Sequence, residues 1–271
     1  SRLVESDRWG DGGIEKGGDD EDLFGLNMNF QADYWTMEGY VFGVRDGFDE
    51  EYGDDKSAPV AVGLRFDASP VEAFDIWGEF AFQFGKYQDS LMLEEESIRA
   101  FGFDVGAVYV FDVTWEPAIA LAYTFGSGDK GDDLDNPSEK MFDPLFNYNY
   151  YGYAYSPKLS NIGILNAQLS VIPSDAWALV LDFYYYSQAE ERAMVMGNPD
   201  MDNGGVTAAT NGEEKNLGME LDVILEYDYT EDVNAQLVAG WFKPGDAYNF
   251  PTNDDSPDDV LEMRAELRIS F

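Results

Sequence analysis

The stretch "LEMRAELRISF", residues 261–271, decides the fold of this chain. Its apolar residues alternate without a break with polar ones, so a strand would carry all the apolar side chains on one face. The other face carries four charges, and the stretch ends on the aromatic Phe271. This pattern is typical of the last strand of a bacterial outer-membrane β-barrel, where apolar residues face lipid and polar residues face the lumen. The alternative is an edge strand of a soluble sandwich.

The same alternation recurs along the chain and predicts about eleven strands in one all-β domain, residues 1–271. Apolar residues at every second position oppose Asn, Gln, Asp, Glu or Gly, except in 35–46, where the pattern is less clear. The expected strands begin near Phe24, Trp35, Val60, Phe74, Phe101, Trp115, Leu165, Trp177, Leu217, Val233 and Leu261.

The connections alternate between short and long. Short turns are expected near Asp33, Ser69–Pro70, Asp112–Thr114, Pro173–Asp175 and Thr230–Asp232, and long loops near 47–57, 89–97, 128–160, 190–216 and 244–259. Outer-membrane barrels have short periplasmic turns and longer extracellular loops, whereas a sandwich has no reason to separate them. The sequence therefore predicts a transmembrane antiparallel β-barrel of the bacterial outer membrane.

The direction of the strands predicts how much of a barrel is present. If Phe271 ends on the periplasmic side, the strand at Phe24 descends from outside, and residues 1–21 form an extracellular loop. Because bacterial single-chain barrels have an even number of strands, we expect an odd number of strands to precede Ser1. The chain is then the C-terminal part of a larger barrel.

Composition excludes several classes of function. The chain contains no cysteine and no histidine, which removes thiolate chemistry and the commonest general base, so no catalytic residue is expected and the protein is not predicted to be an enzyme. Its 54 acidic and 16 basic residues give a formal charge of −38, which argues against nucleic acid as a partner. No stretch approaches the roughly 20 apolar residues that a spanning helix needs.

Aromatic residues are expected to mark the two membrane interfaces. Those beside the short turns fit a periplasmic girdle, and Trp241, towards a long loop, fits the opposite one. The alternative is that aromatic residues are simply good strand formers. The predicted girdle consists of Trp35, Trp115, Trp177, Tyr229, Trp241 and Phe271.

Four segments carry a resemblance to a known family. They are "TFGSGDKGDD" (124–133), "FDPLF" (142–146), "LGMELDVILEY" (217–227) and "GWFKPGDAY" (240–248), and together with the strands they resemble the alginate-export type of outer-membrane porin. The resemblance implies a monomeric barrel of about 18 strands and passage of a solute or polymer across the outer membrane without an energy source.

The phases of the strands assign polar side chains to the lumen. Carboxylates dominate, so the lumen is expected to be net negative and to prefer cations, which disfavours alginate itself. We expect the constriction at Glu220, Asp222 and Glu226 with Glu262, Arg264 and Glu266 on a neighbouring strand, and the arginines paired with carboxylates across strands. The predicted pore lining is Asp75, Glu79, Asp104, Glu116, Asp182, Glu220, Asp222, Glu226, Glu262, Arg264, Glu266 and Arg268, with Arg65 among them.

Two loop features leave alternatives open. The acidic cluster Asp132, Asp133 and Asp135 offers oxygen ligands for Ca²⁺, although a solvated acidic surface is the simpler interpretation and no other cofactor is expected. The aromatic segment 141–155 could enter the barrel as a constriction or sugar platform, contact a partner subunit, or cover the mouth.

These patterns predict an outer-membrane porin for passive diffusion of ions or small hydrophilic solutes, in contact with lipid and lipopolysaccharide. A monomer is favoured, with the oligomeric state open. The alternatives are an export conduit for a secreted polysaccharide and a structural barrel that sheathes a partner protein.

Overall fold

The structure is a computed structural model of the chain, and it describes residues 21–46, 56–88, 95–130, 138–144, 151–191, 210–249 and 257–270. These residues form strands and one short 3₁₀ helix, η2 (Asp246–Tyr248). The strands are β1 (Glu21–Gln31), β2 (Trp35–Asp46), β3 (Lys56–Val71), β4 (Phe74–Gln88), β5 (Glu95–Val110), β6 (Ala118–Gly126), β7 (Ser138–Glu139), β8 (Ile162–Ser174), β9 (Trp177–Gln188), β10 (Asn216–Thr230), β11 (Val233–Pro244) and β12 (Val260–Ile269).

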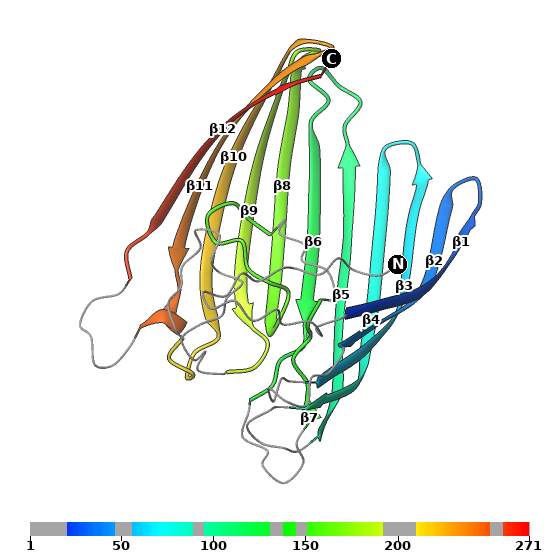
Figure 1. Cartoon of the computed structure of the whole chain (residues 1–271). Helices are drawn as coiled ribbons and strands as arrows, with labels where there is room; N and C mark the ends of the chain where they lie inside the picture. The colour runs from blue at the N-terminus through cyan, green and yellow to red at the C-terminus, as the bar shows by residue number, and fades with distance from the viewer. Residues whose placement is uncertain are drawn as a thin grey trace, which may run out of the picture.

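All the long strands belong to one antiparallel sheet (Figure 1). Each pairs with the next along the chain, from β1 at one edge to β12 at the other, with β7 as a two-residue parallel addition to β5. This confirms the predicted all-β fold and its eleven antiparallel strands. Within the described residues, no helix has the length and apolar character needed to cross a membrane.

The lengths of the connections agree with the prediction, but two turns lie further along the chain than expected. β3 continues past Pro70 to a turn at 72–73, and β8 continues past Pro173 to a turn at 175–176. The register shifts between Ala68 and Val71 and again between Val171 and Ser174. Proline lacks an N–H donor, and an irregularity in the ladder accommodates it without ending the strand.

The strand predicted to begin at Trp115 begins instead at Ala118. Trp115 and Glu116 have φ values of 73° and 43°, and the Glu116 N–H donates to the carbonyl of Val113. Positive φ is incompatible with an extended strand. Both residues therefore belong to the short turn between β5 and β6, which corrects the predicted boundary.

The two faces of the sheet reverse the arrangement of a soluble protein. On the face that we call the apolar face, large side chains are more than half exposed, as in Leu26, Leu64, Leu121, Leu237 and Met263. On the opposite, polar face, side chains that could be charged or hydrogen-bonded are buried, namely Gln83, Thr124, Asp182, Glu220 and Asp222. An apolar surface that extends over a whole sheet needs an apolar environment.

Candidate functional site

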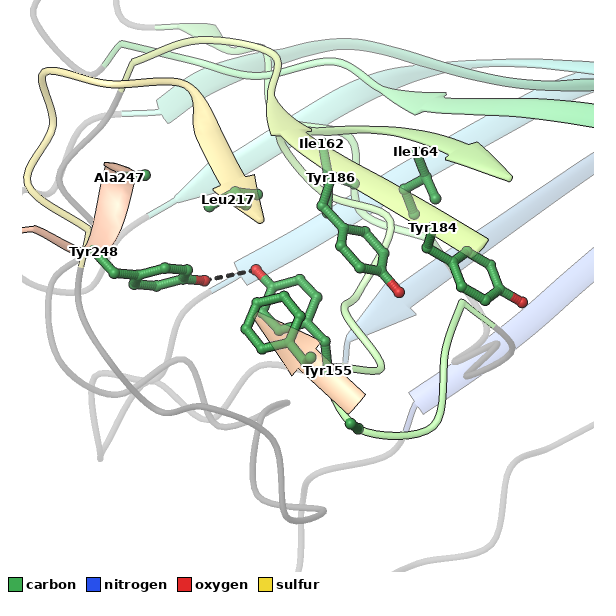
Figure 2. Close-up of a cluster of buried hydrophobic side chains, with 10 residues drawn as sticks. Tyr155, Ile162, Ile164, Tyr184, Tyr186, Leu217, Ala247 and Tyr248 are labelled. Carbon is green, nitrogen blue, oxygen red and sulfur yellow. Dashed lines mark hydrogen bonds between the residues drawn. The ribbon is translucent and has the colours of Figure 1, made fainter. Parts of the chain in front are cut away.

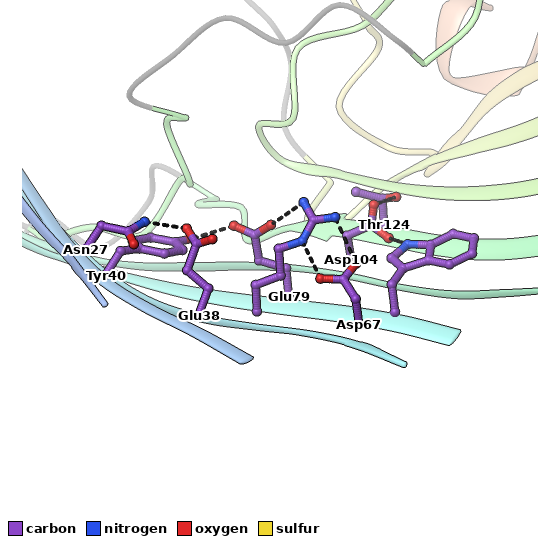
Figure 3. Close-up of polar contacts among 9 residues, drawn as sticks. Asn27, Glu38, Tyr40, Asp67, Glu79, Asp104 and Thr124 are labelled. Carbon is purple, nitrogen blue, oxygen red and sulfur yellow. Dashed lines mark hydrogen bonds and ion pairs between the residues drawn. The ribbon is translucent and has the colours of Figure 1, made fainter. Parts of the chain in front are cut away.

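A row of charged side chains crosses the polar face from β2 to β5 (Figure 3). The strand register places Glu38 opposite Arg65, Arg65 opposite Glu79, and Glu79 opposite Asp104. Thr124 on β6 lies opposite Asp104 and extends the row. Side chains directly opposite each other on one face are neighbours, so these residues form one cross-strand row, which we call the first carboxylate row.

Hydrogen bonds hold the carboxylates of the first row in place. Tyr40 donates to Glu79 at 2.5 Å, and Asn27 donates to Glu38 at 2.5 Å. The indole N–H of Trp77 donates to Asp104 at 2.9 Å. These donors are neutral, so they stabilise the ionised carboxylates without cancelling their charge.

Arg65 is the cation of the first row. Its guanidinium binds both oxygens of Asp67, two residues along β3, at 2.8 and 2.9 Å, and lies 3.9 Å from Glu79 on the neighbouring strand. Both Arg65 and Asp67 are at least two-fifths exposed, and exposed pairs contribute at most about 1 kcal/mol. One arginine therefore faces Glu38, Asp67 and Glu79 together.

A second carboxylate row crosses the other half of the sheet. Asp182 on β9 lies directly opposite Asp222 on β10, with Gly240 of β11 and then Glu262 of β12 next in register. Gln168 donates to Asp182 at 2.9 Å. Like charges directly opposite each other destabilise a sheet, so ionisation of both Asp182 and Asp222 carries a local energetic cost.

The predicted constriction is wrong in one respect. β10 and β12 are not neighbours, because β11 lies between them. The arginines of β12 also pair along their own strand rather than across strands: Arg264 contacts Glu262 at 3.0 Å and Arg268 contacts Glu266 at 3.0 Å. On one face of a strand, residues two apart are neighbours, and this spacing suits the long guanidinium side chain.

Part of the long connection between β6 and β8 folds back onto the polar face. We call residues 151–161 the strap; Figure 1 draws these residues across the strands. Glu220 anchors the strap, because its Oε1 accepts the N–H groups of Tyr153 and Ala154, each at 2.7 Å. Its Oε2 accepts the N–H of Tyr155 at 3.0 Å and the hydroxyl of Tyr186 at 3.2 Å.

The carboxylate of Asp222 lies beside this anchor. Its Oδ2 lies 3.3 Å from the Tyr153 N–H, and its Oδ1 is buried without a hydrogen-bond partner. A Cβ atom at Gly240 would lie 2.7 Å from that oxygen and 3.2 Å from the nitrogen of Ala154. Glycine at this position therefore allows the strap to approach the β10–β11 wall.

Aromatic rings fix the strap over β9 and β11 (Figure 2). The ring of Tyr155 stacks on Phe242 with centroids 4.5 Å apart and also contacts Tyr186 at 4.9 Å. Its hydroxyl lies 2.8 Å from that of Tyr248 in η2. Burial raises the pKa of Tyr248 to about 12 and the pKa of Tyr155 well above its usual value. Both rings are therefore neutral at physiological pH.

The strap reaches as far as β12 on one side and is tied towards β4 on the other. The guanidinium of Arg264 lies 5.7 Å from the centroid of the Tyr153 ring. Lys158 of the strap forms an ion pair with Asp143 at 2.7 Å, and Asp143 is bonded to Gln83 of β4. The described parts of the aromatic segment 141–155 thus lie on the polar face.

Comparison with known proteins assigns the chain to a family. Residues 32–260 match the family described as alginate export. The chain belongs to the alginate export family. It is also 23% identical over 256 residues to the "Alginate production protein AlgE" of Pseudomonas aeruginosa, and the alignment covers 87% of this chain and 44% of that protein. The chain spans less than half the length of this curated relative.

Membership of the alginate export family indicates which environment each face of the sheet contacts. The protein is of the outer-membrane β-barrel type and lies in the outer membrane of a Gram-negative bacterium, as predicted. Its apolar face meets lipid, and its polar face is the wall of the lumen. The two carboxylate rows and the strap accordingly lie on the lumen side.

The structure places most of the predicted lining residues on the polar face, while their role in lining a pore stays a prediction. Strand phase puts Asp75 near the turn end of β4 and Glu226 on β10, where Gln236 donates to it at 2.8 Å. Glu116 lies in a turn instead of on a strand. The predicted lining residues that lie on the polar face are Asp75, Glu79, Asp104, Asp182, Glu220, Asp222, Glu226, Glu262, Arg264, Glu266 and Arg268.

Three of the five described girdle residues lie at strand ends, although the role of the girdle at the interface also stays a prediction. Trp35 and Trp177 begin strands beside short turns, and Tyr229 is 68% exposed beside the turn at 231–232. Trp115 lies in a turn, and Trp241 donates to Asp259 at 3.0 Å. Phe271 and the Ca²⁺ candidates Asp132, Asp133 and Asp135 lie outside the described residues.

The sequence did not predict the positions of several residues on the polar face. Glu38 and Tyr40 lie on β2, where the alternation was unclear. Leu217 was expected on the apolar face but is buried with the strap, because the register shifts between Asn216 and Gly218. The contact between Glu220 and the strap joins residues 65 to 67 positions apart. No local pattern signals such a contact.

Proposed function

We propose that the protein is an export channel through which a hydrophilic polysaccharide crosses the outer membrane. The observation that carries the proposal is the family match over residues 32–260, read together with a lumen wall of hydrogen-bonded polar side chains. The name of the Pseudomonas relative supports a role in polysaccharide production. This function corresponds to the alternative in the sequence analysis, and the family match favours it over a general ion porin.

The charges of the lumen wall suggest the class of polymer. Carboxylates outnumber arginines on the described part of the wall, and Asp182 and Asp222 face each other directly. A wall of one sign attracts the opposite charge and repels its own. The part of the channel formed by this chain therefore suits a neutral or cationic polysaccharide better than a polyuronate.

A second candidate is a passive channel that prefers cations. The first carboxylate row favours it, because Glu38, Glu79 and Asp104 are held by neutral donors and the row contains one arginine. Rings of charged side chains set ion selectivity in pores. The two candidates differ in whether a polymer occupies the lumen.

Single-channel recording in a planar bilayer under a KCl gradient, with the full-length protein, distinguishes the candidates. Neutral, cationic and anionic oligosaccharides of matched length are then added to one side. For the export channel we expect long blocking events by the neutral or cationic oligosaccharide and few by oligoalginate. A reversal potential shifted towards the K⁺ equilibrium value, without block by any oligosaccharide, would support the passive channel. Folded protein without conductance would contradict both.

A further inference from the structure

The strap rests on one buried carboxylate. Three successive backbone N–H groups, from Tyr153 to Tyr155, converge on Glu220, whose side chain is fully buried. Converging N–H groups form a concave site for an anion. Hydrogen bonds to a charged acceptor are roughly twice as strong as neutral ones. Glu220 is therefore the principal polar anchor between the strap and β10.

The wall beneath the strap is poorly suited to permanent cover. Asp222 Oδ1 is buried without a partner, and Asp182 lies directly opposite Asp222. Burial of a carboxylate oxygen without a partner costs free energy, and water in the lumen would remove that cost. The covered arrangement thus holds favourable contacts at Glu220 and an unfavourable one at Asp222, and the unfavourable one offsets part of the free energy that keeps the strap on the wall.

We propose that the strap is a movable constriction of the lumen and that Glu220 is the positioning residue that holds it against the wall. The inference rests on the proposed channel function and adds to it a site that controls passage. In the held position the strap occupies the lumen beside β9 to β12. In the released position it leaves Asp182, Asp222 and Glu220 in contact with lumen water, so release widens the path and makes its wall more acidic.

The first test is the variant Glu220→Gln in the full-length protein, recorded in a planar bilayer under a KCl gradient. Glutamine keeps the size of the side chain but replaces one acceptor oxygen by an N–H donor that faces the strap N–H groups. We expect a higher single-channel conductance and, despite the lost charge, a reversal potential closer to the K⁺ equilibrium value, because Asp182 and Asp222 become accessible.

The matched control is Glu226→Gln, on the same strand and face. Glu226 is bonded to Gln236 and not to the strap. This variant removes the same charge without breaking a contact to the strap, so we expect a slightly weaker K⁺ preference and no rise in conductance. Equal effects of the two variants would mean that Glu220 acts through its charge alone, and the inference would be wrong.

A disulfide provides a test in which the same channel is recorded first with the strap fixed to the wall and then with the strap free. A Cβ atom at Gly240 would lie 3.3 Å from the Cβ of Tyr153, close to the roughly 3.5–4.5 Å of disulfides. The chain has no cysteine of its own. The pair Tyr153→Cys and Gly240→Cys, combined with Glu220→Gln, can therefore be inserted in the oxidised form and reduced afterwards in the bilayer.

With the disulfide closed we expect the conductance of the wild type, and after reduction we expect a rise. Gly240→Cys alone controls for crowding of Asp222 and should not respond to the reductant. A channel that conducts equally before and after reduction would overturn the movable strap and leave the channel function intact. A correctly inserted protein that conducts in neither state would overturn the channel function and the strap together.

Discussion

The side-chain amide of Gln83 pairs with the backbone of Asp143 in both directions. Gln83 Oε1 accepts the Asp143 N–H at 3.0 Å, and its Nε2 donates to the Asp143 carbonyl. The Gln83 side chain is buried on the lumen wall. A side chain thus makes the two bonds that a strand would make, and it ties the connection between β6 and β8 to β4.

We expect Gln83→Ala to leave both backbone groups of Asp143 without these bonds and to lower the free energy of unfolding by about 1–3 kcal/mol. Gln83→Glu should cost as much, because its second oxygen would face the Asp143 carbonyl. Urea unfolding in lipid vesicles measures both effects. Gln236→Ala breaks a hydrogen bond to the half-buried Glu226 and should lower the free energy of unfolding by less. An equal loss in the Gln83 and Gln236 variants would contradict the stabilising role of the contact between Gln83 and Asp143.

The stacked pair of Tyr155 and Phe242 predicts a large effect on stability. Phe242 is fully buried beneath the strap. Phe242→Ala should therefore lower the free energy of unfolding by about 3–5 kcal/mol, whereas Phe242→Leu, which retains more of the volume, should cost less. The same urea titration measures both. Equal midpoints for the two variants would show that the ring packing contributes little.

The tyrosine pair predicts a loss of stability in alkali. Burial raises the pKa of Tyr155 and Tyr248 above the unfolded value near 10, with Tyr248 at about 12. Their contribution is complete below about pH 10 and is lost as the pH rises towards 12. Absorbance at 295 nm should show tyrosines that ionise late, together with a falling unfolding midpoint. The double variant Tyr155→Phe, Tyr248→Phe should show a shallower fall over the same range.

Gly152 offers an independent way to displace the strap. Its φ is +105°, and a Cβ there would lie 2.4 Å from the Tyr186 hydroxyl oxygen and 2.8 Å from Glu220. Gly152→Ala should cost about 1–3 kcal/mol and raise channel conductance. Gly39→Ala is the control, because a Cβ at Gly39 meets no atom within 4 Å. Wild-type conductance in folded Gly152→Ala would contradict this prediction.

The first carboxylate row predicts the ion preference. The triple variant Glu38→Gln, Glu79→Gln, Asp104→Asn leaves Arg65 with Asp67 in the row, so the K⁺ preference should fall. Reversal potentials in a KCl gradient measure it. Glu213→Gln with Glu214→Gln, both exposed beyond the strands, is the control and should change the preference little. A preference retained by the triple variant would place the selective residues elsewhere.

The order of the strands could be predicted because it depends on local periodicity. Alternation in residues 261–269 and in the other long strands follows from a side-chain period of two, and each short turn forces the next strand to be antiparallel. The positions where the predicted strand boundaries fail depend on backbone conformation and not on alternation. Pro70 and Pro173 sit at register shifts, and Trp115 and Glu116 adopt positive φ in a turn. Composition alone does not distinguish such positions from ordinary turn or strand residues.

Apart from β2, Leu217 and Glu116, the sequence by itself determined which face of the sheet each long-strand residue takes, because that choice repeats every two residues and needs no distant partner. It also determined the acidity of the lumen wall. Only the tertiary structure decided that Glu38, Arg65, Glu79 and Asp104 form one row, because cross-strand register fixes which side chains meet. Only the tertiary structure placed the strap on Glu220, since converging backbone N–H groups leave no trace in the identity of the residues that carry them.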